Sequence, residues 1–349
     1  MSFIRAGFAG IAALTLGAMA STAAQAQGLG DFYKGKTITI LVGYGAGGTY
    51  GRTSLLLGKH LGTVIPGKPT IVVQHMPGAG GIKAANYAYN AMPKNGSFLL
   101  MPPEMSIVSE LLRPKKVKFK TKDFTWLGRV FGQNTTVVVR RDTGIKTLED
   151  AMKKEVIVAS SGKGSPTFLI PTLLNALLGT KFKIVKGYKG SQKMQFAMEQ
   201  NEVRGVALGW TAWISGRPHF FKDGDKSFAI PLIQSGFKRQ AGIKHVRMIR
   251  EVLTNKEDVQ IAEMLATASL LGRGLVLPPN APKKLVAPLR KAFAAITKDK
   301  AFIKDAYKRG LEVDPISGAD IQKKVNQILA MSPATVKKAR ALIFPPKKK

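Results

Sequence analysis

The chain has 349 residues, with 54 Lys and Arg against 21 Asp and Glu, and a formal net charge of +33. Its length is sufficient for two domains, and its 45% hydrophobic and 21% charged residues are typical of a globular protein. Because cysteine is absent, disulfides, thiolate nucleophiles and zinc–thiolate sites are excluded. The basic residues are spread along the chain, so the charge fits a solvated surface, the steering of acidic small molecules or contact with nucleic acid.

The N-terminal segment has the pattern of an export signal. Arg5 precedes an uncharged apolar run from Ala6 to Ala20, and Ala24-Gln25-Ala26 matches an A-x-A cleavage site. A membrane anchor is the alternative, but the run is short and rich in Gly and Ala. We therefore predict a signal peptide over residues 1–26, a mature chain that begins at Gln27 and a periplasmic location.

Strand and helix patterns alternate in the next part of the chain, and each of the first two strands leads into a glycine-rich turn. The predicted elements are strand Thr37–Val42, helix Thr53–Leu61, strand Thr70–Gln74, helix Ile82–Ala91 and strand Phe98–Met101. This alternation predicts a mainly parallel sheet with right-handed crossovers. Ligands bind such sheets at the carboxyl ends of the strands, where both glycine turns lie.

A second series of the same kind follows the apolar runs Trp126–Phe131 and Thr135–Val139. Its predicted elements are strand Val156–Ala159, helix Pro166–Leu178, strand Lys183–Lys186, helix Gln192–Gln200 and strand Val203–Leu208. The C-terminal third carries apolar stripes at helical spacing. We therefore predict an α/β protein of two units, each a mainly parallel sheet flanked by helices.

The first glycine turn, Gly43-x-Gly45-x-x-Gly48, matches a dinucleotide-binding fingerprint. That fingerprint also needs an acidic residue at the end of the second strand, and Gln74 and His75 occupy this place. No P-loop motif is present. The sequence thus argues against a nucleotide cofactor, and we predict no cofactor of any kind.

Two long windows of the sequence contain no acidic residue. One lies between Asp31 and Glu104, and the other runs from Val156 to Met198. The turns in these windows offer backbone N–H groups, hydroxyls and basic side chains. Such surroundings favour a bound carboxylate or phosphate over carboxylate catalysis or a hard metal ion.

Catalysis and metal binding have little support in the sequence. The four histidines show no metal-binding spacing, so no metal site is predicted. An exported hydrolase that uses Ser160, Ser161 or Ser165 is an alternative, but no GxSxG motif accompanies these residues. Hydroxyls that bind an oxyanion are the better interpretation, and we predict that the chain is not an enzyme. No nucleic-acid-binding module is recognised.

Four loop motifs, in this order and spacing, make the chain resemble the extracytoplasmic solute receptors of the tripartite tricarboxylate transporter family, the Bug receptors. The motifs are Gly45-Ala46-Gly47-Gly48-Thr49, Pro77-Gly78-Ala79-Gly80-Gly81, Ser160-Ser161-Gly162-Lys163-Gly164-Ser165 and Gly187-Tyr188-Lys189-Gly190-Ser191. The resemblance covers nearly the whole mature chain. It implies a monomeric two-lobed periplasmic-binding-protein fold of type II. This fold would close on a small carboxylate and deliver it to a two-component membrane permease. A binding protein without a transporter partner is the alternative.

The resemblance also implies a ligand site. The first two glycine turns would hold a carboxylate from one lobe, and the serine loop, the Tyr188 turn and the end of strand Val203–Leu208 would close from the other. The implied ligand-binding residues are Tyr44, Ala46, Gly47, Gly48, Thr49, Tyr50, Arg52, Gly78, Ala79, Gly80, Gly81, Ser160, Ser161, Gly164, Ser165, Thr167, Tyr188, Gly190, Ser191, Gly209 and Trp210.

The chain departs from the family pattern where acidic residues are concerned. Tyr50-Gly51-Arg52 stands where the first loop usually carries an Asp, and no Asp lies around Leu208–Thr211. Because an Asp would pair with a ligand amine, its absence favours a di- or tricarboxylate or an aromatic acid over an amino acid.

The predicted lobe boundaries follow from two passages of the chain between the lobes, near residues 135–142 and 232–245. Residues 27–138 and 246–349 would form one lobe, and residues 139–245 would form the other.

Overall fold

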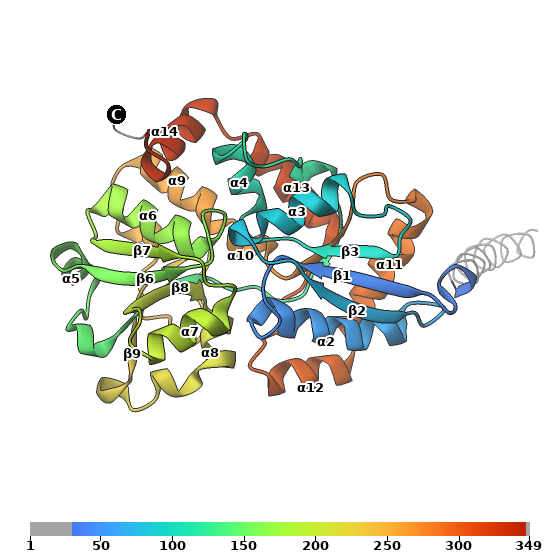
Figure 1. Cartoon of the computed structure of the whole chain (residues 1–349), viewed down its shortest axis with the longest axis horizontal. Helices are drawn as coiled ribbons and strands as arrows, with labels where there is room; N and C mark the ends of the chain where they lie inside the picture. Colours follow the sequence, from blue (N-terminus) through green and yellow to red (C-terminus); the bar gives the residue numbers. More distant parts are fainter. Residues whose placement is uncertain (1–29, 347–349) are drawn as a thin grey trace, which may run out of the picture.

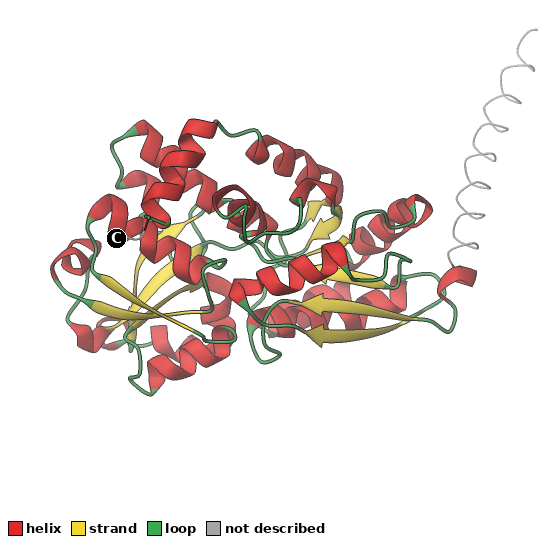
Figure 2. Cartoon of the chain, turned by 45° about the horizontal axis from the view of Figure 1, so that its top comes forward, coloured by secondary structure: helices red, strands yellow, loops and turns green. Residues whose placement is uncertain are grey.

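The computed structural model describes residues 30–346, which form two mixed β-sheets side by side, with helices on both faces of each sheet (Figures 1 and 2). The predicted signal peptide and its cleavage site lie outside these residues. Within the described part, no helix has the length and apolar character needed to cross a bilayer.

The first sheet has six strands in the order β11-β4-β10-β3-β1-β2. Its strands are β1 (Thr37–Val42), β2 (Thr70–His75), β3 (Phe98–Met101), β4 (Thr125–Arg129), β10 (Gly274–Leu277) and β11 (Ile316–Ser317). β1 is parallel to β2 and β3, whereas β10, β4 and β11 are added in antiparallel pairings. We call this sheet and the helices on it the first lobe.

Helices cover both faces of the first sheet, and for this reason β1 is a nearly continuous apolar run. Ile40 and Val42 point into the core beneath α2, α11 and α12, while Leu41 points into the core beneath α3, α4 and α13. The helices are α2 (Thr49–Val64), α3 (Ile82–Asn90), α4 (Ser106–Leu112), α11 (Lys283–Ile296), α12 (Lys300–Lys308) and α13 (Gly318–Leu329).

The second sheet has five strands in the order β7-β6-β8-β5-β9. Its strands are β5 (Thr135–Arg140), β6 (Val156–Ser160), β7 (Phe182–Lys186), β8 (Gly205–Gly209) and β9 (Ala229–Ser235). Helices α5 (Leu148–Lys153), α6 (Pro166–Leu178), α7 (Ser191–Glu199) and α8 (Trp210–Gly216) belong to the same part of the chain. This sheet and the helices packed on it form the second lobe.

The predicted two-lobed α/β fold is confirmed, but the sheets are mixed instead of mainly parallel. β6, β7 and β8 are parallel to one another, whereas β5 is antiparallel to both of its neighbours. β5 arrives directly from the other lobe, and β10 also enters its sheet without a strand–helix–strand crossover. Because only such a crossover imposes parallel pairing, these strands are free to run the other way.

The chain leaves the first lobe in the short segment between β4 and β5. After β9, helix α9 (Lys256–Ala266) packs on α6 and β9, and α10 (Ala268–Leu271) follows. The chain re-enters the first sheet only at β10. Helix α14 (Pro333–Ile343) then crosses once more to pack on α6.

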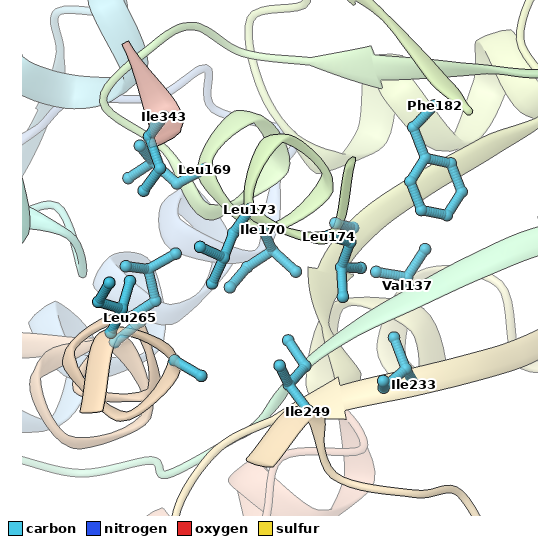
Figure 3. Close-up of a cluster of buried hydrophobic side chains, with 14 of the residues drawn as sticks. Val137, Leu169, Ile170, Leu173, Leu174, Phe182, Ile233, Ile249, Leu265 and Ile343 are labelled. Atoms are coloured by element: carbon cyan, nitrogen blue, oxygen red, sulfur yellow. The ribbon is translucent and has the colours of Figure 1, made fainter. Parts of the chain in front are cut away.

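One apolar core explains this path (Figure 3). Leu265 of α9 and Ile343 of α14 lie in the same cluster as Leu169 and Leu173 of α6, and all four side chains are buried. The periodicity of α9 and α14 predicts buried faces, but it does not say which sheet the faces cover. We therefore propose that the second lobe includes α9 and α14, with its return passage within residues 267–273.

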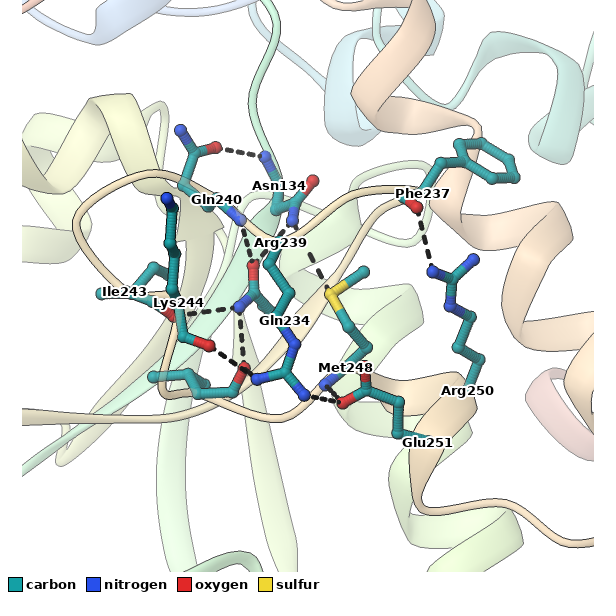
Figure 4. Close-up of polar contacts among 11 residues, drawn as sticks. Asn134, Gln234, Phe237, Arg239, Gln240, Ile243, Lys244, Met248, Arg250 and Glu251 are labelled. Carbon is teal, nitrogen blue, oxygen red and sulfur yellow. Dashed lines mark hydrogen bonds and ion pairs between the residues drawn. The ribbon is translucent and has the colours of Figure 1, made fainter.

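The segment after β9 is fastened to the second lobe by the fully buried side chain of Gln234 (Figure 4). Its Nε2 donates to the carbonyl oxygens of Ile243 and Val246, at 3.1 and 2.8 Å. Its Oε1 accepts from Nδ2 of Asn134 at 2.6 Å and from the backbone N–H of Gln240 at 3.0 Å. Residues 236–246 thus fold back as a loop on the second lobe.

Short 3₁₀ segments complete the secondary structure. They are η1 (Ala79–Gly81), η2 (Thr121–Asp123), η3 (Arg141–Thr143), η4 (Pro218–Phe221), η5 (Gly224–Lys226) and η6 (Ile249–Glu251).

Candidate functional site

A cavity of about 430 Å³, with the open space at its mouth included, lies where the two lobes meet. It is found at the carboxyl ends of β1, β3, β6 and β8, where ligands bind sheets of this kind. The first lobe contributes Tyr44, Gly48, Thr49, Tyr50, Glu104 and Arg273. The second lobe contributes Ser161, Ser165, Pro166, Thr167, Gly190, Ser191, Met194, Leu208, Gly209 and Ala212.

Direct hydrogen bonds join the loops of the two lobes beside this cavity. The backbone N–H of Gly45 donates to the carbonyl oxygen of Lys189 at 2.7 Å. The backbone N–H of Thr49 donates to Oγ of Ser191 at 3.0 Å. A Cβ atom at position 45 would lie 2.9 Å from the Lys189 oxygen, so the approach requires glycine there. The structure is therefore a closed form of the two lobes.

The serine loop between β6 and α6 is held by its own hydroxyls. Oγ of Ser160 accepts from the N–H of Gly162 at 3.1 Å and from Oγ1 of Thr167 at 3.1 Å. Ser160 is fully buried and braces the loop, whereas Ser161, Ser165 and Thr167 line the cavity. No histidine lines the cavity within residues 30–346, so the exported-hydrolase alternative gains no supporting geometry here.

Two tyrosines, with ring planes tilted by 44° to each other, form part of the cavity wall on the first lobe. The rings of Tyr44 and Tyr50 have centroids 4.6 Å apart, and the hydroxyl of Tyr44 donates to the carbonyl oxygen of Gly80 at 3.0 Å. Burial raises the pKa of both tyrosine hydroxyls well above the ordinary value. The two rings thus present a neutral surface, and Tyr44 also holds the second glycine turn in position.

Glu104 and Arg273 form a buried ion pair in the same wall of the cavity. Neither residue is among the ligand-binding residues implied by the sequence. Nη1 of Arg273 is 3.6 Å from Oε2 of Glu104, and the guanidinium lies 5.0 Å from the ring centroid of Tyr50. Burial raises the pKa of the Glu104 carboxyl, and Arg273 opposes this shift. Glu104 follows β3 and Arg273 precedes β10, so the pairing of these two strands brings the residues together.

Comparisons with known proteins agree with this architecture. No family model matches the chain. Over 345 residues it is 25% identical to the UPF0065 protein in the gbd 5′ region of Cupriavidus necator, which covers 96% of this chain and 94% of that protein. The periplasmic binding protein BugD superposes with a TM-score of 0.69 at 20% identity, covering 88% of this chain and 98% of that chain. The chain has the fold of the Bug-type solute-binding proteins. The resemblance inferred from the four loop motifs is thereby confirmed.

Two further structures with the Bug-type fold are from Rhodopseudomonas palustris. MatC with bound malate has a TM-score of 0.66 at 17% identity, and it covers 88% of this chain and 99% of that chain. A protein determined with adipate has a TM-score of 0.64 at 19% identity, with 87% of this chain and 97% of that chain covered.

The cavity brings together about half of the residues that the Bug-type resemblance implied. Those that line it are Tyr44, Gly48, Thr49, Tyr50, Ser161, Ser165, Thr167, Gly190, Ser191 and Gly209. Those that do not line it in this closed form are Ala46, Gly47, Arg52, Gly78, Ala79, Gly80, Gly81, Ser160, Gly164, Tyr188 and Trp210. The ligand-binding role of all of them remains a prediction.

Several residues outside the lining have other contacts that explain their position. Glycines 80 and 164 lie where the loops of the two lobes abut. The hydroxyl of Tyr188 donates to Glu202, and the Trp210 ring packs on Phe221 with centroids 4.9 Å apart. The lining residues that the sequence did not suggest are Glu104, Pro166, Met194, Leu208, Ala212 and Arg273.

Arg52 connects the lobes at the edge of the site. Its Nη1 donates to the carbonyl oxygen of Ser215 at 2.9 Å, and its Nη2 donates to the Ser215 hydroxyl at 3.0 Å. Burial lowers the pKa of Arg52, and Arg217 and Arg309 lower it further. This side chain therefore acts as a latch on the closed form.

Arg52→Met should weaken ligand binding about fivefold, because it removes two charge-assisted hydrogen bonds that only the closed form makes and that are partly exposed to solvent. Isothermal titration with the best carboxylate ligand measures the change. Lys59→Met on the same helix is the control, since Lys59 pairs with Asp305 within the first lobe. Equal affinity of the Arg52 variant and the wild type would contradict the latch role.

Proposed function

We propose that the chain is an exported, periplasmic solute-binding protein of the Bug type. It binds a small organic carboxylate between its lobes and delivers it to a two-component membrane permease. The observation that carries this proposal is the cavity between the lobes, where hydroxyls, a buried guanidinium and glycine loops from both sides meet at strand ends.

The chemistry of the lining supports a small organic acid as the ligand. Ser161, Thr167 and Ser191 offer hydroxyls, while Met194 and Leu208 offer apolar contact for a carbon chain. Malate and adipate in the two Rhodopseudomonas palustris structures are acids of this class. Di- and tricarboxylates are therefore the first ligands to test, followed by aromatic acids.

Thermal-shift titration of the mature chain, residues 27–349, tests the binding function. A ligand that binds only the folded state adds about 2.7 kcal/mol to the free energy of unfolding at 100 times Kd. The unfolding temperature therefore rises as the ligand concentration is increased. We expect this response from at least one carboxylate and not from its methyl ester. A shift with nucleotides or nucleic acid, and with none of the acids, would contradict the proposal.

Delivery to a permease needs a separate experiment. Cells that lack this gene should take up the labelled ligand more slowly than the parent cells, and the wild-type gene should restore uptake. Unchanged uptake would favour the alternative, a binding protein without a transporter partner.

A further inference from the structure

The guanidinium of Arg273 is buried but poorly satisfied. The residue is 2% exposed, and its Nε and Nη1 atoms are enclosed without a hydrogen-bond partner in the described part of the chain. Its contact with Glu104, at 3.6 Å, is an ion pair but is longer than a hydrogen bond. A buried cation whose donors remain unpaired is costly, so its position calls for an anionic partner in the cavity that both side chains line.

The backbone at Arg273 is also held in an unfavourable conformation. Its φ is +62°, in the left-handed region that non-glycine residues seldom adopt. Such strain persists only where the surrounding structure fixes it, and it is concentrated at functional sites. The strained residue turns a charged side chain toward the cavity, which a residue that only filled the core would not need to do.

Glu104 complements Arg273 within the same wall. It is 7% exposed and lines the same cavity, so it offers a buried acceptor next to the guanidinium donors. Arg273 suits an anionic group of the ligand, and Glu104 suits a hydrogen-bond donor. Because the two side chains are adjacent, these two groups of the ligand should also be adjacent. A plain dicarboxylate satisfies Arg273 but places no donor on Glu104.

We propose that Arg273 and Glu104 determine the ligand class, and that the ligand is an acid with an ammonium or hydroxyl group on the carbon next to its carboxylate. Arg273 binds the carboxylate, and Glu104 accepts from the neighbouring donor. This inference rests on the proposed function. It also supplies, from β3 and its following loop, the acidic partner for a ligand donor that the sequence lacks near Leu208–Thr211.

Isothermal titration with matched acids tests the proposal on the wild-type protein. Succinate, malate and aspartate share one carbon skeleton and carry hydrogen, hydroxyl or ammonium at the same carbon. Propionate, lactate and alanine form a second series, and phenylpropionate, phenyllactate and phenylalanine form a third. We expect a hydroxy or amino member to bind about tenfold more tightly, or more, than the unsubstituted acid of its series.

Two variants test whether Arg273 and Glu104 cause the preference for the substituted acids. Arg273→Met should remove binding of all three members of the preferred series. Glu104→Gln should weaken the amino acid about tenfold or more, with a smaller effect on the unsubstituted acid. Glu155→Gln and Arg247→Met, at exposed positions outside the cavity, should leave every affinity unchanged. Circular dichroism checks that the variants fold. The order of wild-type affinities within each series tests the proposal even if a variant does not fold.

The outcomes separate this inference from the proposed function. If no carboxylate binds, the proposed function fails. If the unsubstituted acids, or an aromatic acid without a neighbouring donor, bind as tightly as the substituted ones, the proposed function stands and the role of Glu104 is overturned.

Discussion

Gly164→Ala should weaken ligand binding by about tenfold or more while both lobes remain folded. A Cβ atom at this position would lie 2.6 Å from the carbonyl oxygen of Ala79 and 2.6 Å from Cγ1 of Ile82. Both atoms belong to the first lobe, whereas Gly164 belongs to the serine loop of the second. The Ala79 oxygen is a main-chain atom and cannot rotate away, so the added methyl group acts against closure.

The effect on affinity follows from the population of the closed form. If the ligand binds only the closed form, the apparent Kd rises in inverse proportion to the fraction of closed molecules. Titration calorimetry measures the affinity, and small-angle scattering measures the compactness of the protein without ligand. Lys163→Ala, at the exposed neighbouring position, is the control and should bind normally. Undiminished affinity of the Gly164 variant would show that binding does not require this approach of the loops.

Arg129→Met should lower the free energy of unfolding by about 2–4 kcal/mol, the largest stability effect expected here from a single polar side chain. Arg129 is 3% exposed, at the end of β4 just before the chain leaves the first lobe. Its Nη1 donates to the carbonyl oxygen of Ser269, and its Nη2 donates to that of Asp314, both at 2.7 Å. One side chain therefore ties the first passage between the lobes, and the proposed return passage near Ser269, to the first sheet.

The expected loss arises mainly from acceptors that are left without a donor. The Asp314 carboxylate also pairs with Arg129 but is 65% exposed, so water replaces that contact at little cost. Chemical denaturation gives the free energy, and Arg247→Met is the matched control. Arg247 pairs with Glu149 at the surface and should change stability by about 0.5 kcal/mol or less. Similar losses for the two variants would contradict the argument.

The sequence predicted the fold well wherever a strand was followed by a turn and a helix. β1, β3 and the start of α6 at Pro166 lie where their patterns indicated. The antiparallel strands were not predicted, because strand direction depends on the partner and the connection, which local pattern does not contain. The lobe that receives α9 and α14 was not predicted for the same reason.

The loops of the candidate site could be predicted, because glycine turns and hydroxyls are concentrated in short motifs. Glu104 and Arg273 could not, since their pairing depends on the register of β3 against β10. One signal was present: Glu104 is the first acidic residue after the long acid-free window, and it follows a predicted strand. Position at a strand end could have placed it at the ligand-binding edge of the sheet.

The position of α14 has a consequence for the order in which the protein folds. This helix follows the other helices and strands of residues 30–346, yet Val336, Ala339 and Ile343 complete the core around α6. Synthesis adds about 5–20 residues per second and generally allows N-terminal domains to fold first. Here the apolar core of the second lobe is complete only after residues 333–343 have been synthesised. Although α6 is made much earlier, part of its apolar surface stays uncovered until α14 is available to pack on it.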